Sequence, residues 1–354
     1  MVTIKDIAQV AGVSESTVSR VLGKPLEECN VSEPLQRRVR EVANKFSYQP
    51  NLMARGLATS RTGNIGLIIY RYEHLTYPVM TQVVAGVAEA ISYSEYSLLI
   101  EAIYQPGKQA TDSQKLSGLF ARRQVDGLII VAQEIEPIWL LDLIREKYPF
   151  VLCNVHFSEI AANSVRTNAI ERGKESIRYF AKLGHRNIAL FLGPKNIQNK
   201  PSRGGVVEGI HIAASELGIK IAAEDLIHTG YSQEEAHDET IKLLSKAKPP
   251  TAIYAADDAI AVGVLEAAQK LGFDVPGKLS ILSGVDTYKT QLASIPITAV
   301  QIPYDKIGFK SAELLLKRLQ ENEEGESQQV FLPFNIVERK SCGPINCARI
   351  LEII

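Results

Sequence analysis

From Asn64 onward, short apolar segments alternate with longer amphipathic segments, and this alternation restricts the fold more than any other feature of the sequence. The apolar segments are continuous runs rich in Ile, Leu and Val, which is typical of strands covered on both faces. The predicted strands are NIGLIIY, YSLLIEAIY, VDGLIIVA, PFVLCNV, IALFLG, LIHTG, TAIYAA and LSILSGV. The predicted helices between them include VVAGVAEAISYSE, QKLSGLFARRQ, EGIHIAASELG, EEAHDETIKLLSKA and AIAVGVLEAAQKLG. This order predicts parallel sheets with helices on both faces.

The length of the alternating region predicts two such sheets of about a hundred residues each, and hence two lobes. Open α/β sheets bind ligands at the carboxyl ends of their strands. Two facing lobes would therefore hold a small molecule between them.

The first twenty-two residues predict two short helices joined by a tight turn. Thr3 is suited to cap the first helix, with Asp6 as its partner in a capping box, and Gly12 to end it. Ser14 is suited to cap the second helix, with Thr17 three positions further on. The residues predicted to be buried are Ile7, Ala8 and Val10, followed by Val13, Val18, Val21 and Leu22.

The outward face of the second helix carries short hydroxyls and one arginine. Small hydroxyls let a helix approach a duplex closely and bond to phosphates or base edges, and Arg20 is able to fork onto guanine O6 and N7. The alternative is an ordinary helical hairpin whose polar face is merely solvated. The residues assigned to DNA contact in this part of the chain are Thr3, Ser14, Glu15, Ser16, Thr17, Ser19 and Arg20.

Further helical signals follow this hairpin. VSEPLQRRVREVANKFSYQPN predicts a third helix, capped by Ser32 and ending near Tyr48, with an inward face of Val39, Val42, Ala43 and Phe46. NLMARGLATSRTGNIG predicts one short basic helix and then a linker of Ser, Thr and Gly.

TIKDIAQVAGVSESTVSRVL, followed by YQPNLMARGLATSRTGNIGLII, is similar to the N-terminus of the lac/gal repressor family of bacterial transcription regulators. The resemblance continues through LGHRNIALFLGP, AADDAIAVGVLEAAQKLGFDVP and ITAVQIPYDKIGFKSAELLLKRL, and it covers Val2 to about Cys342. It implies a helix-turn-helix DNA-binding domain, a hinge helix, and a two-lobed α/β core with parallel sheets, like that of periplasmic sugar-binding proteins.

In this family the hinge helix becomes ordered on operator DNA and enters the minor groove. The resemblance places it at Asn51 to Ala58, with Leu57 at the position of an apolar wedge that kinks the duplex. The other interpretation is that Leu57 and Met53 simply contact the core. The resemblance assigns minor-groove contact to Asn51, Ala54, Arg55 and Leu57.

The resemblance also predicts the domain boundaries. We expect the DNA-binding domain at residues 1–50, the hinge helix and linker at 51–63, and the effector-binding and dimerisation core at 64–341. The chain is expected to cross between lobes near Ser164, Ile295 and Glu324. The first lobe is then 64–164 with 296–324, the second is 165–295 with 325–341, and 342–354 form a tail of unknown role.

Aromatic residues follow the first predicted strand in YRYEHLTYP, where they suit a sugar or polyol ring, although a solvated loop contains such residues equally well. The segment Asp257-Asp258-x-x-Ala261-x-Gly263 resembles a family motif in which Asn usually stands at the position of Asp257, and Asp286 in SGVDT matches an acidic residue at the next strand end. Relatives often hold the effector with an arginine where this chain has Val206, and Arg203 is the substitute predicted here. The predicted effector-binding residues are Tyr70, Tyr72, Tyr77, Arg203, Asp257 and Asp286.

The composition fits a cytoplasmic regulator. No signal peptide or membrane-spanning run is seen, and the four cysteines form no pattern typical of a zinc site or a disulfide framework. Residues 1–61 carry nine Lys and Arg against six Asp and Glu, a net charge of +3, which leaves −4 on the remainder of a chain with total charge −1. The positive end is the predicted DNA end.

The leading hypothesis is a repressor that binds a pseudo-palindromic operator in double-stranded DNA as a homodimer, controlled by a small, sugar-like effector. Inducer and co-repressor action both remain open. The rival is a soluble sugar-binding protein with an accessory DNA-binding domain. An enzyme is a distant third, because no catalytic motif, metal site or cofactor motif is present, so no cofactor is expected.

Overall fold

The computed structural model describes residues 2–23, 29–48, 61–104, 113–132, 135–157, 159–195, 205–321 and 326–345. They belong to two compact units. The first is Met1–Asn64 with Arg123–Asp126, and the second is Ile65–Arg122 with Gly127–Ile354. The predicted hinge helix and Arg203 lie outside the described residues.

The described residues of the first unit form three helices: α1 (Ile4–Ala11), α2 (Glu15–Leu22) and α3 (Glu33–Lys45). The predicted capping box of α1 is confirmed, since the side chain of Thr3 accepts from the Asp6 backbone N–H and the Asp6 carboxylate accepts from the Thr3 backbone N–H. Gly12 ends α1 with φ of 64°, a left-handed conformation that glycine adopts without strain.

The three helices share one small apolar core. Two predicted members are wrong: Val10 is 57% exposed and Phe46 is 41% exposed. On α1 the inward position one turn after Ile7 is Ala11, one residue beyond Val10, and Phe46 follows the end of α3. The buried apolar residues are Ile7, Ala8, Ala11, Val18, Val21, Cys29, Val39 and Ala43.

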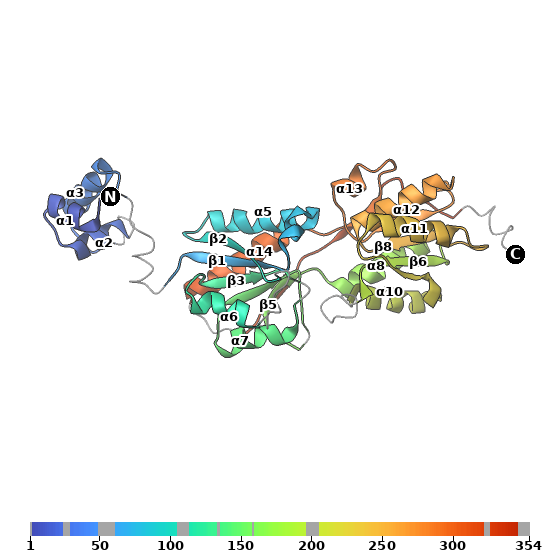
Figure 1. The fold of residues 1–354 in the computed structure, drawn as a ribbon, viewed down its shortest axis with the longest axis horizontal. Coiled ribbons are helices and arrows are strands. Elements are labelled where there is room, and N and C mark those ends of the chain that lie inside the picture. Colours follow the sequence, from blue (N-terminus) through green and yellow to red (C-terminus); the bar gives the residue numbers. More distant parts are fainter. Residues whose placement is uncertain are drawn as a thin grey trace. The chain divides into compact units, whose positions relative to one another are not determined.

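The first sheet of the second unit has the strand order β11-β5-β4-β3-β1-β2, and its strands pair in parallel from β11 through to β1. Figure 1 shows α5 and α14 together on one face of this sheet, with α6 and α7 on the other. The strands are β1 (Asn64–Ile69), β2 (Ser97–Ala102), β3 (Gly127–Ile130), β4 (Phe150–Cys153), β5 (Asn163–Arg166) and β11 (Gln329–Phe331). The helices are η2 (Tyr72–Thr76), α5 (Pro78–Ser92), α6 (Ser113–Ala121), η3 (Pro137–Leu140), α7 (Leu141–Arg145) and α14 (Tyr304–Glu321).

The second sheet repeats the scheme with the order β12-β10-β9-β8-β6-β7, and only β12 is antiparallel among its described strands. Helices α8 and α10 pack together on one face and α11 with α12 on the other (Figure 1). The strands are β6 (Ile188–Leu192), β7 (Leu226–His228), β8 (Ala252–Ala255), β9 (Ser280–Ser283), β10 (Thr298–Gln301) and β12 (Asn335–Val337). The helices are α8 (Ala169–Lys182), α10 (Gly205–Glu216), η4 (Ala223–Asp225), α11 (Gln233–Leu244), α12 (Asp258–Lys270) and α13 (Tyr288–Gln291).

The chain changes from one sheet to the other later than expected. Strand β10 belongs to the second sheet, so the chain leaves that sheet after Gln301 and not near Ile295. Strand β11 pairs with β5 in the first sheet, so the last change follows Phe331 and not Glu324. These strands are short and lie at or near sheet edges, where the apolar pattern is weak and the partner strand decides the assignment.

The end of the described chain belongs to the second lobe, although the sequence assigns it to a tail. The Gly343 backbone N–H donates to Ser280 Oγ at 3.1 Å, and the Ile345 backbone N–H donates to the Leu183 carbonyl at 2.9 Å. His185 is 2% exposed and its ring nitrogens contact Thr251 Oγ1 at 3.0 Å and Ser280 Oγ at 2.9 Å. His185 therefore has a structural role, joining the turn after α8 to the starts of two strands.

Candidate nucleic-acid interface and ligand-side residues

The N-terminus of α2 presents a cluster of hydroxyl groups. Ser14 Oγ accepts the Thr17 backbone N–H at 3.2 Å, which caps the helix. The hydroxyls of Ser16 and Thr17 each lie 2.8 Å from Ser14 Oγ. The free N–H groups and the positive end of the helix dipole favour an anion at this point, and phosphate is the anion of a duplex backbone.

The outward face of α2 is polar along its length. Glu15, Ser16, Ser19 and Arg20 are exposed, and Thr17 is half-buried. Within the described residues the Arg20 side chain makes no hydrogen bond or ion pair, so its guanidinium is available to a partner. This face has the size and chemistry that a major groove accepts.

The end of α2 is fixed to its surroundings through its backbone. Arg40 on α3 donates to the Val21 carbonyl at 2.9 Å. The Cys29 thiol donates to the Arg20 carbonyl at 3.7 Å, and Gln36 donates to the Cys29 and Val31 carbonyls at 3.1 and 2.7 Å. These bonds hold the helix in place while its outer side chains stay free to bind.

Thr3, which is also predicted to contact DNA, caps the start of α1 in the structure. Its hydroxyl donates to Asp6 Oδ2 at 2.8 Å and accepts from the Asp6 backbone N–H at 3.3 Å. The hydrogen bonds that the Thr3 backbone N–H and the Thr3 hydroxyl donate to the carboxylate lower the pKa of Asp6. The predicted contacts of Asn51, Ala54, Arg55 and Leu57 lie outside the described residues and stay predictions.

An anchor that sequence analysis missed holds the residues before β1. The Asp126 carboxylate accepts the Thr62 backbone N–H at 2.7 Å and the Gly63 backbone N–H at 2.9 Å. An isolated Asp in a loop gives no signal of this kind, because its partners lie 63 and 64 positions earlier in the chain.

Aromatic rings gather at the carboxyl ends of β1 and β2. The ring centroids of Tyr70 and Tyr104 lie 5.4 Å apart, and the Arg71 guanidinium lies 3.8 Å from the Tyr104 centroid. Tyr77 stacks on His74 at 5.2 Å but is 55% exposed. Tyr72, in η2, is 54% exposed. Tyr70 thus belongs to an ordered cluster, whereas Tyr72 and Tyr77 lie at the surface.

In the second lobe, Asp257 caps α12 at the carboxyl end of β8. Its Oδ1 accepts the Ala259 backbone N–H at 3.0 Å. Burial raises the pKa of Asp257 to about 7, and the adjacent Asp258 carboxylate adds to the increase. An acid of this kind is held partly protonated near neutral pH, so it is able both to donate and to accept hydrogen bonds.

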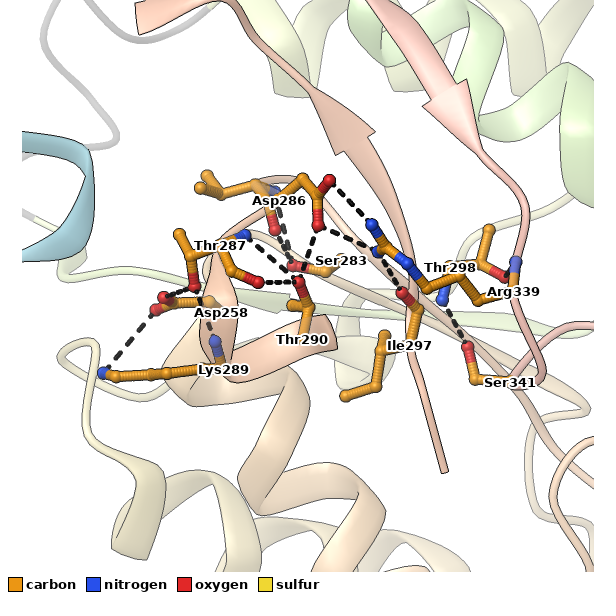
Figure 2. A network of polar contacts seen from close by, with 11 residues as sticks. Asp258, Ser283, Asp286, Thr287, Lys289, Thr290, Ile297, Thr298, Arg339 and Ser341 are labelled. Carbon is orange, nitrogen blue, oxygen red and sulfur yellow. Dashed lines mark hydrogen bonds and ion pairs between the residues drawn. The ribbon is translucent and has the colours of Figure 1, made fainter. Parts of the chain in front are cut away.

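Asp258 itself points into a buried polar network that Figure 2 shows. It accepts from the Thr287 hydroxyl at 2.5 Å, and Lys289 Nζ lies 3.8 Å from its Oδ1. Thr287 also caps α13. The network therefore joins the start of α12 to the start of α13.

The structure gives Asp286 a role different from the predicted effector contact. Both of its carboxylate oxygens accept from Arg339, each at 2.8 Å, and Oδ1 also accepts from the Thr290 hydroxyl at 2.8 Å (Figure 2). The Asp286 side chain is only 2% exposed and that of Arg339 is 16% exposed. Asp286 is thus committed to an internal ion pair, and we do not carry it forward as an effector residue.

Sequence reasoning missed Arg339, Thr290 and Lys289. Arg339 is 53 residues from Asp286 and lies after the short strand β12, so no local pattern joins the two. The four-residue helix α13 has too few turns to give a helical periodicity. Ser341, two residues after Arg339, accepts from the Thr298 backbone N–H through its hydroxyl. No pattern in the sequence marks either residue for its contact.

Over the ranges described above, no group of three or more His, Cys, Asp or Glu side chains is arranged to hold a metal ion. In the same residues, no helix is both long and apolar enough to cross a membrane.

Comparison with known proteins covers both units. Residues 3–51 match the bacterial regulatory proteins of the lacI family, and residues 177–342 match the periplasmic binding protein-like domain. The chain is 28% identical over 348 residues to the HTH-type transcriptional regulator DegA of Bacillus subtilis (strain 168), which covers 97% of this chain and 99% of the relative.

Two solved structures resemble the fold. A lac repressor dimer bound to operator and the anti-inducer ONPF has a TM-score of 0.82 at 24% identity, covering 97% of this chain and 99% of that chain. A complex of the transcriptional regulator CelR with cellobiose has a TM-score of 0.68 at 22% identity, covering 96% of this chain and 100% of that chain. These matches confirm the predicted fold class, a helix-turn-helix domain followed by a two-lobed core with parallel sheets.

Proposed function

Because the chain belongs to the lacI family of bacterial regulatory proteins, we propose that it is a sequence-specific repressor whose affinity for operator DNA is controlled by a small-molecule effector. The observation that carries this proposal is the outward face of α2. That face combines a capped N-terminus, exposed hydroxyls and an Arg20 side chain that is unpaired among the described residues. In this proposal Arg20 reads a base edge, and Ser14, Ser16 and Thr17 position the helix on phosphates.

We propose that two copies act together. One short recognition helix reads one half-site, and a second copy related by two-fold symmetry reads the other half of a pseudo-palindrome. The resemblance to the lac repressor dimer supports this arrangement. Asn51, Ala54, Arg55 and Leu57 are the proposed minor-groove contacts, since the match to the lacI family extends to residue 51 and the sequence resemblance continues beyond it.

The proposed effector is a carbohydrate or a related metabolite. Support comes from the aromatic cluster at Tyr70 and from Asp257, which lie at the carboxyl ends of β1 and β8. The fold likeness to the CelR–cellobiose complex agrees with this class of ligand. The remaining proposed contacts are Tyr72, Tyr77 and Arg203.

Effector binding needs to favour one arrangement of the lobes by only a few kcal/mol to change DNA affinity. As a member of this family, the chain is a regulator and not an enzyme. The match at residues 3–51 is the reason to set aside the rival, a solute-binding protein with an accessory domain. We propose that it acts in the cytoplasm, where its DNA is.

Selection of bound duplexes from a random pool, with the full-length protein, tests this function. An enriched pseudo-palindrome, bound by two copies of the chain, is the expected result. Repeating the selection with a panel of sugars and phosphorylated metabolites will show whether a ligand releases or strengthens binding. Failure to enrich any sequence, with or without ligands, would contradict the proposal.

A further inference from the structure

Arg172, at the end of the first turn of α8, lies at the ligand side of the second sheet. A short turn joins the end of α8 to β6, so the start of α8 lies at the carboxyl end of β6. Helix α10 begins at the same end, because it follows β6. The close contact between the starts of α8 and α10 supports this placement, because a Cβ added to Gly173 would lie 2.0 Å from the Val206 carbonyl oxygen. Ligands of open α/β sheets bind at this edge.

Arg172 differs from its cationic neighbours on α8 because it has no acidic partner in the part of the chain that the structure describes. Lys174 Nζ lies 3.1 Å from Glu171, and Arg178 lies 2.8 Å from Glu175. In contrast, the Arg172 guanidinium makes no hydrogen bond or ion pair with any described residue, and its Nε is buried without an acceptor. A half-buried cation is normally compensated for lost hydration by hydrogen bonds or an acidic partner. Arg172 has neither among the described residues.

The surroundings of Arg172 contain further polar atoms at the same edge. Burial raises the pKa of Tyr254 to about 12, and the positive charge of Arg172 opposes this increase, which places the guanidinium near the phenol. The Tyr254 hydroxyl lies against Gly284, just after β9: a Cβ added to Gly284 would lie 2.4 Å from the hydroxyl oxygen. Thr229, directly after β7, is fully buried, and its Oγ1 has no partner among the described residues.

The acids at this edge do not neutralise Arg172. The charge interactions of Asp257 are with Asp258 and Lys289, and Asp286 is paired with Arg339. A guanidinium fork matches the two oxygens of a carboxylate or a phosphate, and such charge-assisted pairs are the strongest hydrogen bonds available here. The missing partner is therefore best supplied by a ligand.

We propose that Arg172 binds an anionic group, a carboxylate or a phosphate, of the effector, and so selects acidic metabolites over neutral sugars. This rests on the proposed function, since it assigns the effector's chemical class. Tyr254 and Thr229 lie at the same edge and offer hydroxyl groups to the rest of that ligand.

Calorimetric titration of the full-length protein tests this with four probes: glucuronate, glucose 6-phosphate, neutral glucose and inorganic phosphate. We expect the wild type to bind glucuronate or glucose 6-phosphate at least tenfold more tightly than glucose. Arg172→Met should weaken binding of that anion about 10- to 100-fold and leave glucose unaffected. Arg172→Lys should lose less affinity for the anion than Arg172→Met, because lysine keeps the positive charge but not the two-pronged guanidinium. The two anionic sugars distinguish a carboxylate from a phosphate source.

Arg178→Met is the matched control, because this arginine lies on the same helix with its charge already paired. It should bind every probe as the wild type does. Thermal unfolding without ligand separates binding from folding: Arg172→Met should be at least as stable as the wild type, since it removes an unpaired cation. A wild type with no preference for an anion, or an Arg172→Met variant that keeps the preference or is less stable, would overturn the inference.

The two proposals fail separately. An operator that is bound normally, without any preference for anionic probes, would contradict only the role of Arg172. Preferred binding of an anion without any enriched DNA sequence would contradict the repressor function and support the role of Arg172.

Discussion

Three ionisable side chains of the second lobe lie close to one another and yet have different roles. Asp257 caps a helix with a raised pKa, Asp258 joins two helix starts, and Asp286 forms a closed ion pair with Arg339. The surroundings of each carboxylate decide its role, because burial beside another acid favours the neutral form of Asp257, whereas the Arg339 guanidinium holds the charge of Asp286.

The raised pKa of Asp257 predicts how its replacement will affect stability. Its folded pKa of about 7 is above the ordinary value of 3.8, so its contribution to stability is complete below pH 3.8 and is lost as the pH rises through 7. Asp257→Asn keeps the cap without the charge. We expect it to raise the free energy of unfolding at pH 8 by roughly 2 kcal/mol and to change little at pH 4. Urea unfolding at both pH values measures this, with the exposed Asp238→Asn as control.

The ion pair of Asp286 and Arg339 predicts a strong effect when one partner is removed. Arg339→Met should lower the free energy of unfolding by about 3 to 5 kcal/mol, because it leaves a buried carboxylate without compensation. The double variant with Asp286→Asn should recover part of this loss. Chemical denaturation of the single and double variants tests it, and equal losses in both would show that the pair is not the cause.

The proposed base contact is made by a single exposed side chain, that of Arg20. Arg20→Ala should weaken binding to the selected operator by roughly 1 to 3 kcal/mol and relax one base position in each half-site. Unfolding should not change, because the side chain is exposed and unpaired within the described chain. A repeated selection would contradict base reading by Arg20 if the preferred sequence stayed the same.

At the scale of secondary-structure elements, α2 depends on one side chain at its start. Ser14→Ala removes the cap to the Thr17 backbone N–H and should destabilise the helix by about 1 kcal/mol. Hydrogen exchange of the α2 amides in the full-length protein should then become faster. Ser16→Ala, an exposed hydroxyl on the same turn, is the control and should leave exchange nearly unchanged. Faster exchange in both variants to the same extent would contradict a specific cap.

The helices and strands that could be predicted from the sequence are those whose signals lie within a few neighbouring residues. The caps of α1 and α2 join residues three positions apart, so Thr3, Asp6, Ser14 and Thr17 were sufficient to identify both helix starts. The strands in the middle of each sheet were equally clear, because burial on both faces requires continuous apolar runs. The strands β5, β10, β11 and β12 were not recognised, because their sequences, NSVR, TAVQ, QVF and NIV, include polar residues and form no continuous apolar run.

At the scale of the whole molecule, His185 makes stability depend on pH. Burial lowers its pKa below the ordinary 6.5. The unfolded chain therefore takes up a proton near pH 6.5 that the folded protein does not, and the stability contributed above that pH is lost as the pH falls. The contribution of His185 should be lost between pH 7 and 5, opposite in sign to the gain that Asp257 supplies over the same range.

His185→Gln should flatten this contribution, because it removes the titrating ring. At pH 7.5 the variant should itself be less stable by roughly 1 to 3 kcal/mol, since buried hydrogen bonds to Thr251 and Ser280 are lost or weakened. Unfolding curves over this pH range compare the two proteins. An unchanged slope in the variant would assign the pH dependence to another group.

The amino-acid sequence alone determined the helix-turn-helix, the alternation of strands and helices, and the α2 face proposed for DNA. All of these rest on patterns repeated every two to four residues, so they can be read along the chain. The tertiary structure alone decided which sheet receives the late strands, that Arg339 pairs with Asp286, and that Arg172 has no partner among the described residues. Each of these depends on groups brought together from distant positions, where burial and pairing, and not local spacing, set the energy.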